Sequence, residues 1–182
     1  MLLFVGLGNP TPDSEDNRHN VGFKIIDAIN QKFSLSKQKP KFKGLLTTGN
    51  INGEKVYAIK PLTFMNNSGI CIRELIEYFK MDAEDVIVFH DDLDIDFGKI
   101  KAKFAGSSAG HNGIESIDKF IGKDYSRVRI GIGKPKIPKA KDAVAEHVLK
   151  DFDEDEKQEL IKITSNITDS LPILIDKKLD LF

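Results

Sequence analysis

The chain has 182 residues but only one cysteine and no tryptophan. The single cysteine, Cys71, excludes an intrachain disulfide and any zinc site built from several cysteines. Long apolar runs are also missing, since no stretch reaches the roughly 20 residues that span a bilayer. No basic leader precedes the first apolar run, so we expect a cytoplasmic protein with no membrane partner.

Two enzyme signatures are incomplete or absent. Gly6-Leu7-Gly8 follows a strand-like run, but Thr11 stands where the third glycine of a dinucleotide-binding loop is required. This spacing disfavours a nucleotide-dependent enzyme. Neither Ser14 nor Ser68 lies on the strand-to-helix turn of a nucleophile elbow, so a serine nucleophile is not expected either. We therefore expect no cofactor.

The hydrophobic pattern alternates between strands and helices. It predicts strands over residues 2–5, 45–51, 55–59, 86–89, 100–104 and 128–132, and helices over 21–33, 69–79, 114–121, 143–149 and 154–171. Pro172 should end or kink the last helix. No linker divides the chain, so we expect a single α/β domain over residues 1–182. The predicted fold is a three-layer sandwich with a mixed, mostly parallel central sheet flanked by helices.

Polar side chains gather in the loops that should follow the central strands. His19 lies beyond the first strand, and Asp91 follows closely after the strand over residues 86–89. An imidazole can accept a proton near neutral pH, and a carboxylate on its other nitrogen fixes the tautomer. Such a pair has the parts for proton transfer without a metal, and the alternative is that His19 only caps or packs at the start of the following helix. A second alternative is that the acidic run from Asp91 to Asp94 binds Mg²⁺.

Several asparagines precede predicted helices. Asn66 and Asn112 can position a substrate through uncharged amides, but residues of this type also cap helix N-termini. Capping is the competing explanation for both. His147 stands alone in a predicted helix and is expected to be a surface or packing residue rather than a zinc ligand.

The formal net charge of −1 gives no overall basic excess, but the distribution is uneven. Residues 99–141 hold 11 Lys and Arg against 3 Asp and Glu. Lys103 and Arg129 belong to this basic stretch, together with Arg127, Lys139 and Lys141. Such a cluster suits the phosphates of a nucleic acid. A solvated lysine-rich surface is the alternative.

Six motifs occur in one order along the chain and resemble bacterial peptidyl-tRNA hydrolase. They are Gly6-Leu7-Gly8-Asn9-Pro10, Arg18-His19-Asn20-Val21-Gly22, Pro61-Leu62-Thr63-Phe64-Met65-Asn66, His90-Asp91-Asp92-Leu93-Asp94, Gly110-His111-Asn112-Gly113 and Arg127-Val128-Arg129-Ile130-Gly131-Ile132-Gly133. The resemblance implies an esterase that frees tRNA from peptidyl-tRNA, acting as a monomer on RNA rather than DNA.

The same resemblance implies roles for individual residues. His19 becomes the catalytic base and Asp91 its partner, while Asn9, Met65, Asn66 and Asn112 line the site. Phe64 lies beside the 3′ end of the tRNA. Ser14 stands where the family usually has a tyrosine, and residues 105–109 replace much of a glycine run. A noncatalytic RNA-binding domain is the rival function, but such a domain has no need of the His19/Asp91 pair.

Overall fold

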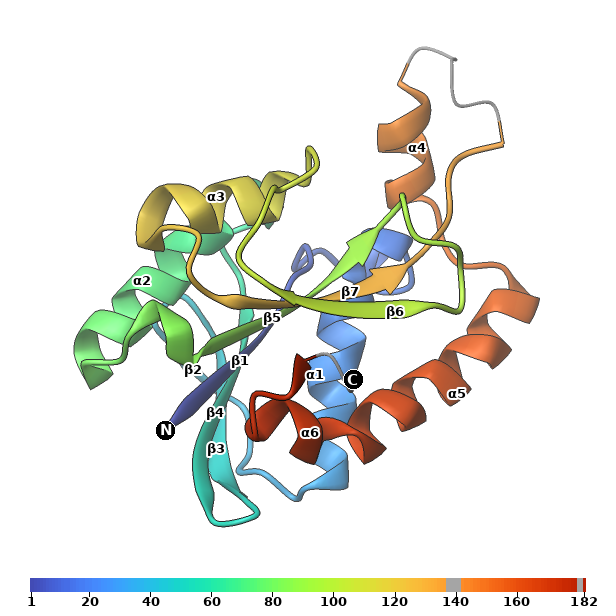
Figure 1. The fold of residues 1–182 in the computed structure, drawn as a ribbon. Helices are drawn as coiled ribbons and strands as arrows, with labels where there is room; N and C mark the ends of the chain where they lie inside the picture. Colours follow the sequence, from blue (N-terminus) through green and yellow to red (C-terminus); the bar gives the residue numbers. More distant parts are fainter. Residues whose placement is uncertain (137–141, 180–181) are drawn as a thin grey trace.

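A seven-stranded sheet organises the computed structural model, which describes residues 1–136, 142–179 and 182 (Figure 1). The strands are β1 (Leu2–Gly6), β2 (Lys39–Lys41), β3 (Gly44–Ile51), β4 (Glu54–Pro61), β5 (Val86–Asp92), β6 (Ile100–Phe104) and β7 (Ser126–Gly131). Their order is β2-β3-β4-β1-β5-β7-β6. The four central strands are parallel, and β3 and β6 run in the opposite direction.

Helices cover both faces of this sheet, which confirms the predicted three-layer sandwich. They are α1 (Val21–Lys32), α2 (Ser68–Phe79), α3 (Asn112–Ile121), α4 (Ala143–Leu149), α5 (Glu154–Asp169) and α6 (Leu171–Ile175). In Figure 1, α2 and α3 lie on one face, α1, α5 and α6 lie on the other, and α4 stands beyond the edge of the sheet. None of the described helices is long and apolar enough to cross a membrane.

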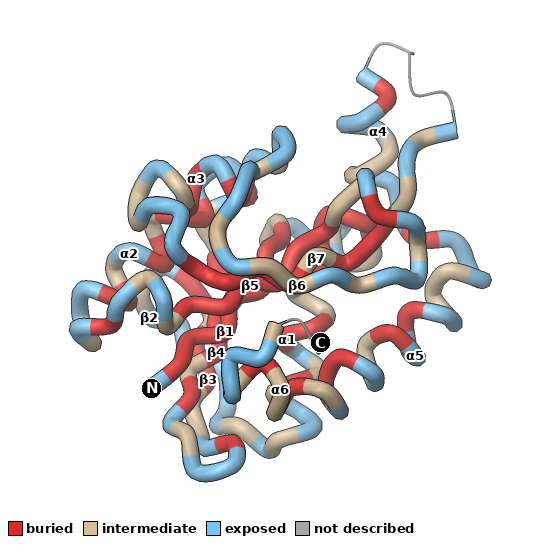
Figure 2. Tube along the Cα trace, in the orientation of Figure 1, coloured by how far each residue is buried: buried red, intermediate tan, exposed pale blue. Residues whose placement is uncertain are grey.

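Strand β1 shows how the sequence builds two cores. Its five residues are all buried, as expected for a central strand covered on both faces (Figure 2). Because successive side chains point to opposite faces, Leu3 and Val5 pack with α2 and α3, whereas Leu2 and Phe4 pack with α1 and α5. The carboxyl ends of β1 and β5 therefore meet between two packed layers.

Two details of the chain differ from the pattern-based prediction. The sequence Lys39-Pro40-Lys41 forms the exposed edge strand β2, which has no apolar residue to signal it. The last predicted helix does break before Pro172, since α5 ends at Asp169, but Pro172 itself lies in the first turn of a separate helix, α6, that was not predicted. Proline is accepted there because the first helical N–H groups need no partner within the helix.

Candidate active site

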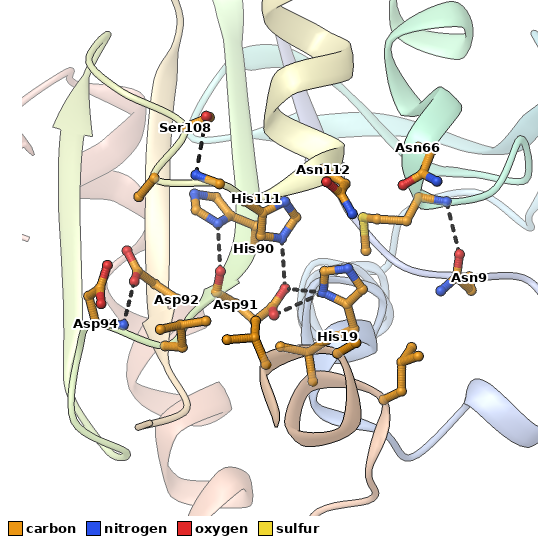
Figure 3. A pocket seen from close by; sticks show the side chains of 18 of the residues that line it. Asn9, His19, Asn66, His90, Asp91, Asp92, Asp94, Ser108, His111 and Asn112 are labelled. Carbon is orange, nitrogen blue, oxygen red and sulfur yellow. Dashed lines mark hydrogen bonds and ion pairs between the residues drawn. The ribbon is translucent and has the colours of Figure 1, made fainter. Parts of the chain in front are cut away.

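A cleft of 890 Å³ opens at the carboxyl ends of the parallel strands (Figure 3). Its lining includes His19, Asp91, Asn9, Asn66 and Asn112, so the structure brings together five residues predicted from separate parts of the sequence. Open α/β sheets present loops from several strands at this edge. The position of the cleft follows from the strand order.

His19 is held against Asp91 by a close approach of backbones. His19 lies on a 3₁₀ turn, Arg18–Asn20, that leads directly into α1. Near the start of α1, a Cβ added to Gly22 would lie 2.4 Å from the Phe89 carbonyl oxygen on β5. Only glycine allows α1 to approach β5 this closely. As a result, the Nδ1 atom of His19 lies 2.9 Å from both carboxylate oxygens of Asp91.

A second imidazole, that of His111, binds the same carboxylate. The Nδ1 atom of His111 accepts hydrogen bonds from the backbone N–H groups of Gly113 and Ile114, at 3.1 and 3.3 Å. The proton of a neutral His111 must therefore be on Nε2, which donates to Asp91 Oδ1 at 2.8 Å. The sequence contained His111 within a motif, but nothing in its spacing showed that it would face Asp91.

Asp91 is an ionised acceptor for both rings. Its burial raises the carboxyl pKa, but the neighbouring His111 and His19 outweigh that effect, and the pKa lies well below its ordinary value. An ionised carboxylate only accepts hydrogen bonds, so Nδ1 of His19 is the donor. The other ring nitrogen, Nε2, then carries the lone pair. Figure 3 shows this nitrogen on the side of the ring where the amides gather.

The amide of Asn9 is oriented by the backbone. The N–H group of Met65 donates to Asn9 Oδ1 at 2.9 Å, which leaves the Asn9 NH₂ group as a donor. The N–H of Asn9 donates to Asn20 Oδ1, and Asn20 Nδ2 donates back to the Asn9 carbonyl, both at 2.9 Å. Asn20 thus fixes the loop that carries Asn9.

Helix capping does not account for the other two asparagines. The side chain of His111 caps α3. The N-cap position of α2 is occupied by Asn67, whose side chain makes no capping hydrogen bond. The side chains of Asn66 and Asn112 instead line the cleft with Asn9 (Figure 3). Three neutral amides therefore lie near the lone-pair nitrogen of His19.

The adjacent residue His90 is buried and uncharged. Its Nδ1 donates to the Asp91 carbonyl at 2.8 Å, which makes Nε2 the acceptor. Burial lowers the pKa of His90 to about 3. His90 thus supports the Asp91 backbone without adding positive charge beside His19.

A metal ion fits this arrangement poorly. In the described part of the chain, His19, Asp91 and His111 form the one group whose ligand atoms lie close enough, within 4.8 Å of one another. Ligation through His111 Nε2 would move its proton to Nδ1, against two backbone N–H donors. The carboxylates of the acidic run do not point at one common ion position either. Asp92 Oδ1 accepts a hydrogen bond from the Asp94 N–H, and the Asp94 carboxylate faces Lys134.

Comparisons with known proteins identify the family. The family model for peptidyl-tRNA hydrolase matches residues 3–181. The chain belongs to the peptidyl-tRNA hydrolase family. A peptidyl-tRNA hydrolase of Pelagibacter ubique is 84% identical over all 182 residues and 96% of its own length, and one of Bartonella henselae is 43% identical over 96% of this chain and 89% of its own.

The fold agrees as well. The crystal structure of peptidyl-tRNA hydrolase from Acinetobacter baumannii has a TM-score of 0.92 and 32% identity, covering 100% of this chain and 91% of that chain. The fold and family expected from the peptidyl-tRNA hydrolase motifs are thereby confirmed.

Other residues predicted from the family resemblance lie around the cleft or outside it. Met65 is buried in the lining, and Phe64 is 53% exposed at its mouth. Phe64 has φ 67° and ψ 156°, a backbone conformation that strongly favours glycine. Ser14 is not among the lining residues, and its hydroxyl lies 2.6 Å from that of Thr11.

The predicted basic stretch divides into two parts. Arg127 is 1% exposed and bonds Asp118 at 3.1 Å, so it is a structural residue. Lys103 and Arg129 lie on the same face of β6 and β7, outside the cleft lining. Partial burial, followed by the charges of Arg129 and Arg127, lowers the pKa of Lys103, as expected where cations crowd together. Lys139 and Lys141 lie outside the described residues.

Proposed function

We propose that this chain hydrolyses the ester bond between a peptide, or an N-blocked aminoacyl group, and the 3′ end of tRNA, as the names of its relatives indicate. The observation that carries the assignment is the ionised Asp91 between two imidazole donors, with the lone pair of His19 facing three amides. A noncatalytic RNA-binding domain gains nothing from this arrangement.

The proposed reaction uses water as the nucleophile. His19 Nε2 takes a proton from water while the water oxygen attacks the ester carbonyl. The Asp91 carboxylate stabilises the imidazolium that forms. The protonated ring then gives its proton to the departing ribose oxygen, which releases tRNA and the free acid. General base catalysis of this kind is commonly worth roughly 10²- to 10⁴-fold.

The amides have a separate proposed role. The NH₂ groups of Asn9, Asn66 and Asn112 can donate to the ester oxygen as negative charge develops there, and to the acyl and terminal ribose groups. Such donors stabilise the transition state most when they are already oriented, as Asn9 is by Met65 and Asn20. Phe64 at the cleft mouth is placed to stack on the terminal base.

Lys103 and Arg129 are proposed to bind phosphates of the acceptor arm. The Lys103 ammonium donates to the Ser107 carbonyl at 3.3 Å, in the loop whose next residue lines the cleft. Arg129 lies 3.9 Å from the carboxylate of Asp92, which also lines the cleft. The two cations therefore lie beside the cleft but outside its lining. A substrate made by ribosomes also implies work in the cytoplasm, and we propose that the protein acts as a monomer.

Deacylation of N-acetyl-aminoacyl-tRNA tests the assignment. We expect the purified protein to release free tRNA from this substrate, with and without prior dialysis against EDTA, when the tRNA is folded beforehand. The unblocked aminoacyl-tRNA serves as the comparison substrate. Binding of the tRNA without release would favour the RNA-binding alternative, and loss of release on chelation with recovery by Mg²⁺ would favour the acidic site.

A further inference from the structure

Helix α4 forms one wall of the cleft but is poorly suited to hold itself in place. It has seven residues and no side-chain N-cap, and a helix this short is marginal without tertiary contacts. Its cleft-facing residues include Val144 and Leu149, which are 48% and 53% exposed. The position of this wall must therefore be set by contacts elsewhere.

Arg18, the residue before His19, supplies contacts at the end of α4, in addition to the bond between the His147 ring and the Gly133 carbonyl at 2.9 Å. Its guanidinium donates to the carbonyls of His147 and Lys150 at 3.2 and 3.4 Å, where α4 ends. A cation at this end of a helix satisfies free carbonyls and complements the helix dipole. The same group bonds Glu156 of α5 at 2.8 Å, and the Arg18 side chain is only 9% exposed.

Backbone pairing strengthens the connection. The N–H of Arg18 donates to the Lys150 carbonyl, and the N–H of Phe152 donates to the Asp16 carbonyl, both at 3.1 Å. Asn17 and Asp151 form an antiparallel bridge between them. The segment that follows α4 is thus paired with the segment that precedes the catalytic base.

The chemistry of this side of the cleft indicates what it receives. Asp92, Asp94 and Asp142 line the cleft together with the apolar residues of α4. Asp92 and Asp94 face the cations Arg129 and Lys134, which partly neutralise them, so the apolar side chains of α4 set the character of this wall and favour an uncharged, apolar group. The acyl side chain of the substrate matches this wall better than the tRNA does.

We infer that Arg18 is a positioning residue, which sets the distance between the α4 wall and His19 and thereby the affinity for large apolar acyl side chains. The inference rests on the proposed function. Arg18 is not among the residues that line the cleft. Its effect passes through the carbonyls at the end of α4.

Two measurements on Arg18→Gln test this role. Hydrogen exchange should show faster exchange of the α4 amides, and kinetics should show a KM about 5- to 10-fold higher for N-acetyl-leucyl-tRNA, the size of effect expected from losing much of one apolar contact. The KM for N-acetyl-glycyl-tRNA should change less than about twofold, and kcat for both should stay within about threefold, since His19 and Asp91 are untouched.

Lys24→Gln is the matched control. Lys24 bonds Asp16 at 2.8 Å in the same segment, so the variant removes a neighbouring ion pair away from the carbonyls that end α4. It should leave the leucyl to glycyl ratio of KM unchanged. Glu156→Gln removes the ion pair of Arg18 but keeps its hydrogen bonds to α4, so it should raise α4 exchange and the KM for N-acetyl-leucyl-tRNA by a smaller amount. It serves as the test variant if Arg18→Gln does not fold.

Unchanged exchange in α4, or an equal loss for both substrates, would overturn the role of Arg18. Failure of the proposed function looks different, because the unmodified protein would then release no tRNA from either substrate while the exchange experiment still reports on α4.

Discussion

The centre of the cleft and its margin are built in opposite ways. The centre comprises His19, His90, Asp91 and His111, at the ends of β1 and β5, where each imidazole has a hydrogen-bond partner on Asp91. The margin comprises α4, the loop over residues 105–110 and the edge strand β6, where many side chains are exposed. Buried polar groups tolerate little change, so we assign the proposed chemistry to the centre and the proposed substrate selection to the margin.

The largest effect should come from removing the base at the centre. His19→Ala should leave the fold intact and lower kcat for N-acetyl-aminoacyl-tRNA by about 10²- to 10⁴-fold, because it removes the nitrogen proposed to take the proton from water. Single-turnover deacylation with circular dichroism as the check on folding measures this. Turnover near the normal rate would show that His19 is not the general base and that the proposed chemistry does not depend on the centre.

Asp91→Asn should have the next largest effect. Asparagine is uncharged, so both imidazole N–H groups lose a charged acceptor and the imidazolium of His19 loses the carboxylate that stabilises it. A hydrogen bond to a charged group is worth about 1.5–3 kcal/mol, which corresponds to a roughly 10- to 100-fold loss of kcat. With His19→Ala in the same chain, the two losses should be less than additive. Additive losses would show that the residues act independently.

The centre should also make folding sensitive to acid. The unfolded chain protonates His90 near pH 6.5, whereas the folded protein does so only near pH 3, so lowering the pH within this window favours unfolding. The contribution of His90 to the free energy of unfolding should fall by about 2 kcal/mol when the pH is lowered from 7 to 5. Urea titrations of the protein and of His90→Asn at both pH values measure it. An equal pH dependence in the two proteins would show that His90 does not titrate this way.

At the margin, losing cations should weaken binding rather than chemistry. Lys103→Ala combined with Arg129→Ala should raise KM about tenfold, with little change in kcat, and should reduce the slope of log affinity against log salt by about 1.5. Asn112→Ala is the comparison, because an uncharged amide releases no counterions and should leave the slope unchanged. Equal slopes in all three proteins would rule out the proposed phosphate site.

The smallest effect should come from the loop of the margin. Ala109 has φ 48°, a left-handed conformation that costs an L-residue about 1 kcal/mol. Ala109→Gly should therefore raise the free energy of unfolding by about 0.5–1 kcal/mol, measured by urea titration. Ala102→Gly on the regular strand β6 should lower it instead. Destabilisation by both would show that the loop is not strained at residue 109.

Sequence reasoning succeeded where a residue's environment depends on near neighbours in the chain. The buried run of β1 and the periodic helices were predicted closely, and motif order identified the family. His111 was missed as a partner of Asp91 because the pairing depends on how α3 meets β5. Arg127 was grouped with the phosphate-binding cations because a charge count cannot show that Asp118 neutralises it.

The central place of β1 in the sheet has a consequence for the order of folding. Leu3 pairs with Tyr57 on β4 and with Val86 on β5, so the first strand made by the ribosome waits for partners far along the chain. Closing such long loops is slow compared with forming local helices. Because Asp91 arrives on β5 and His111 later still, the His19 side chain gains its partners only when the centre of the sheet is complete. The rate at which esterase activity recovers during refolding should therefore report when β5 has docked onto β1.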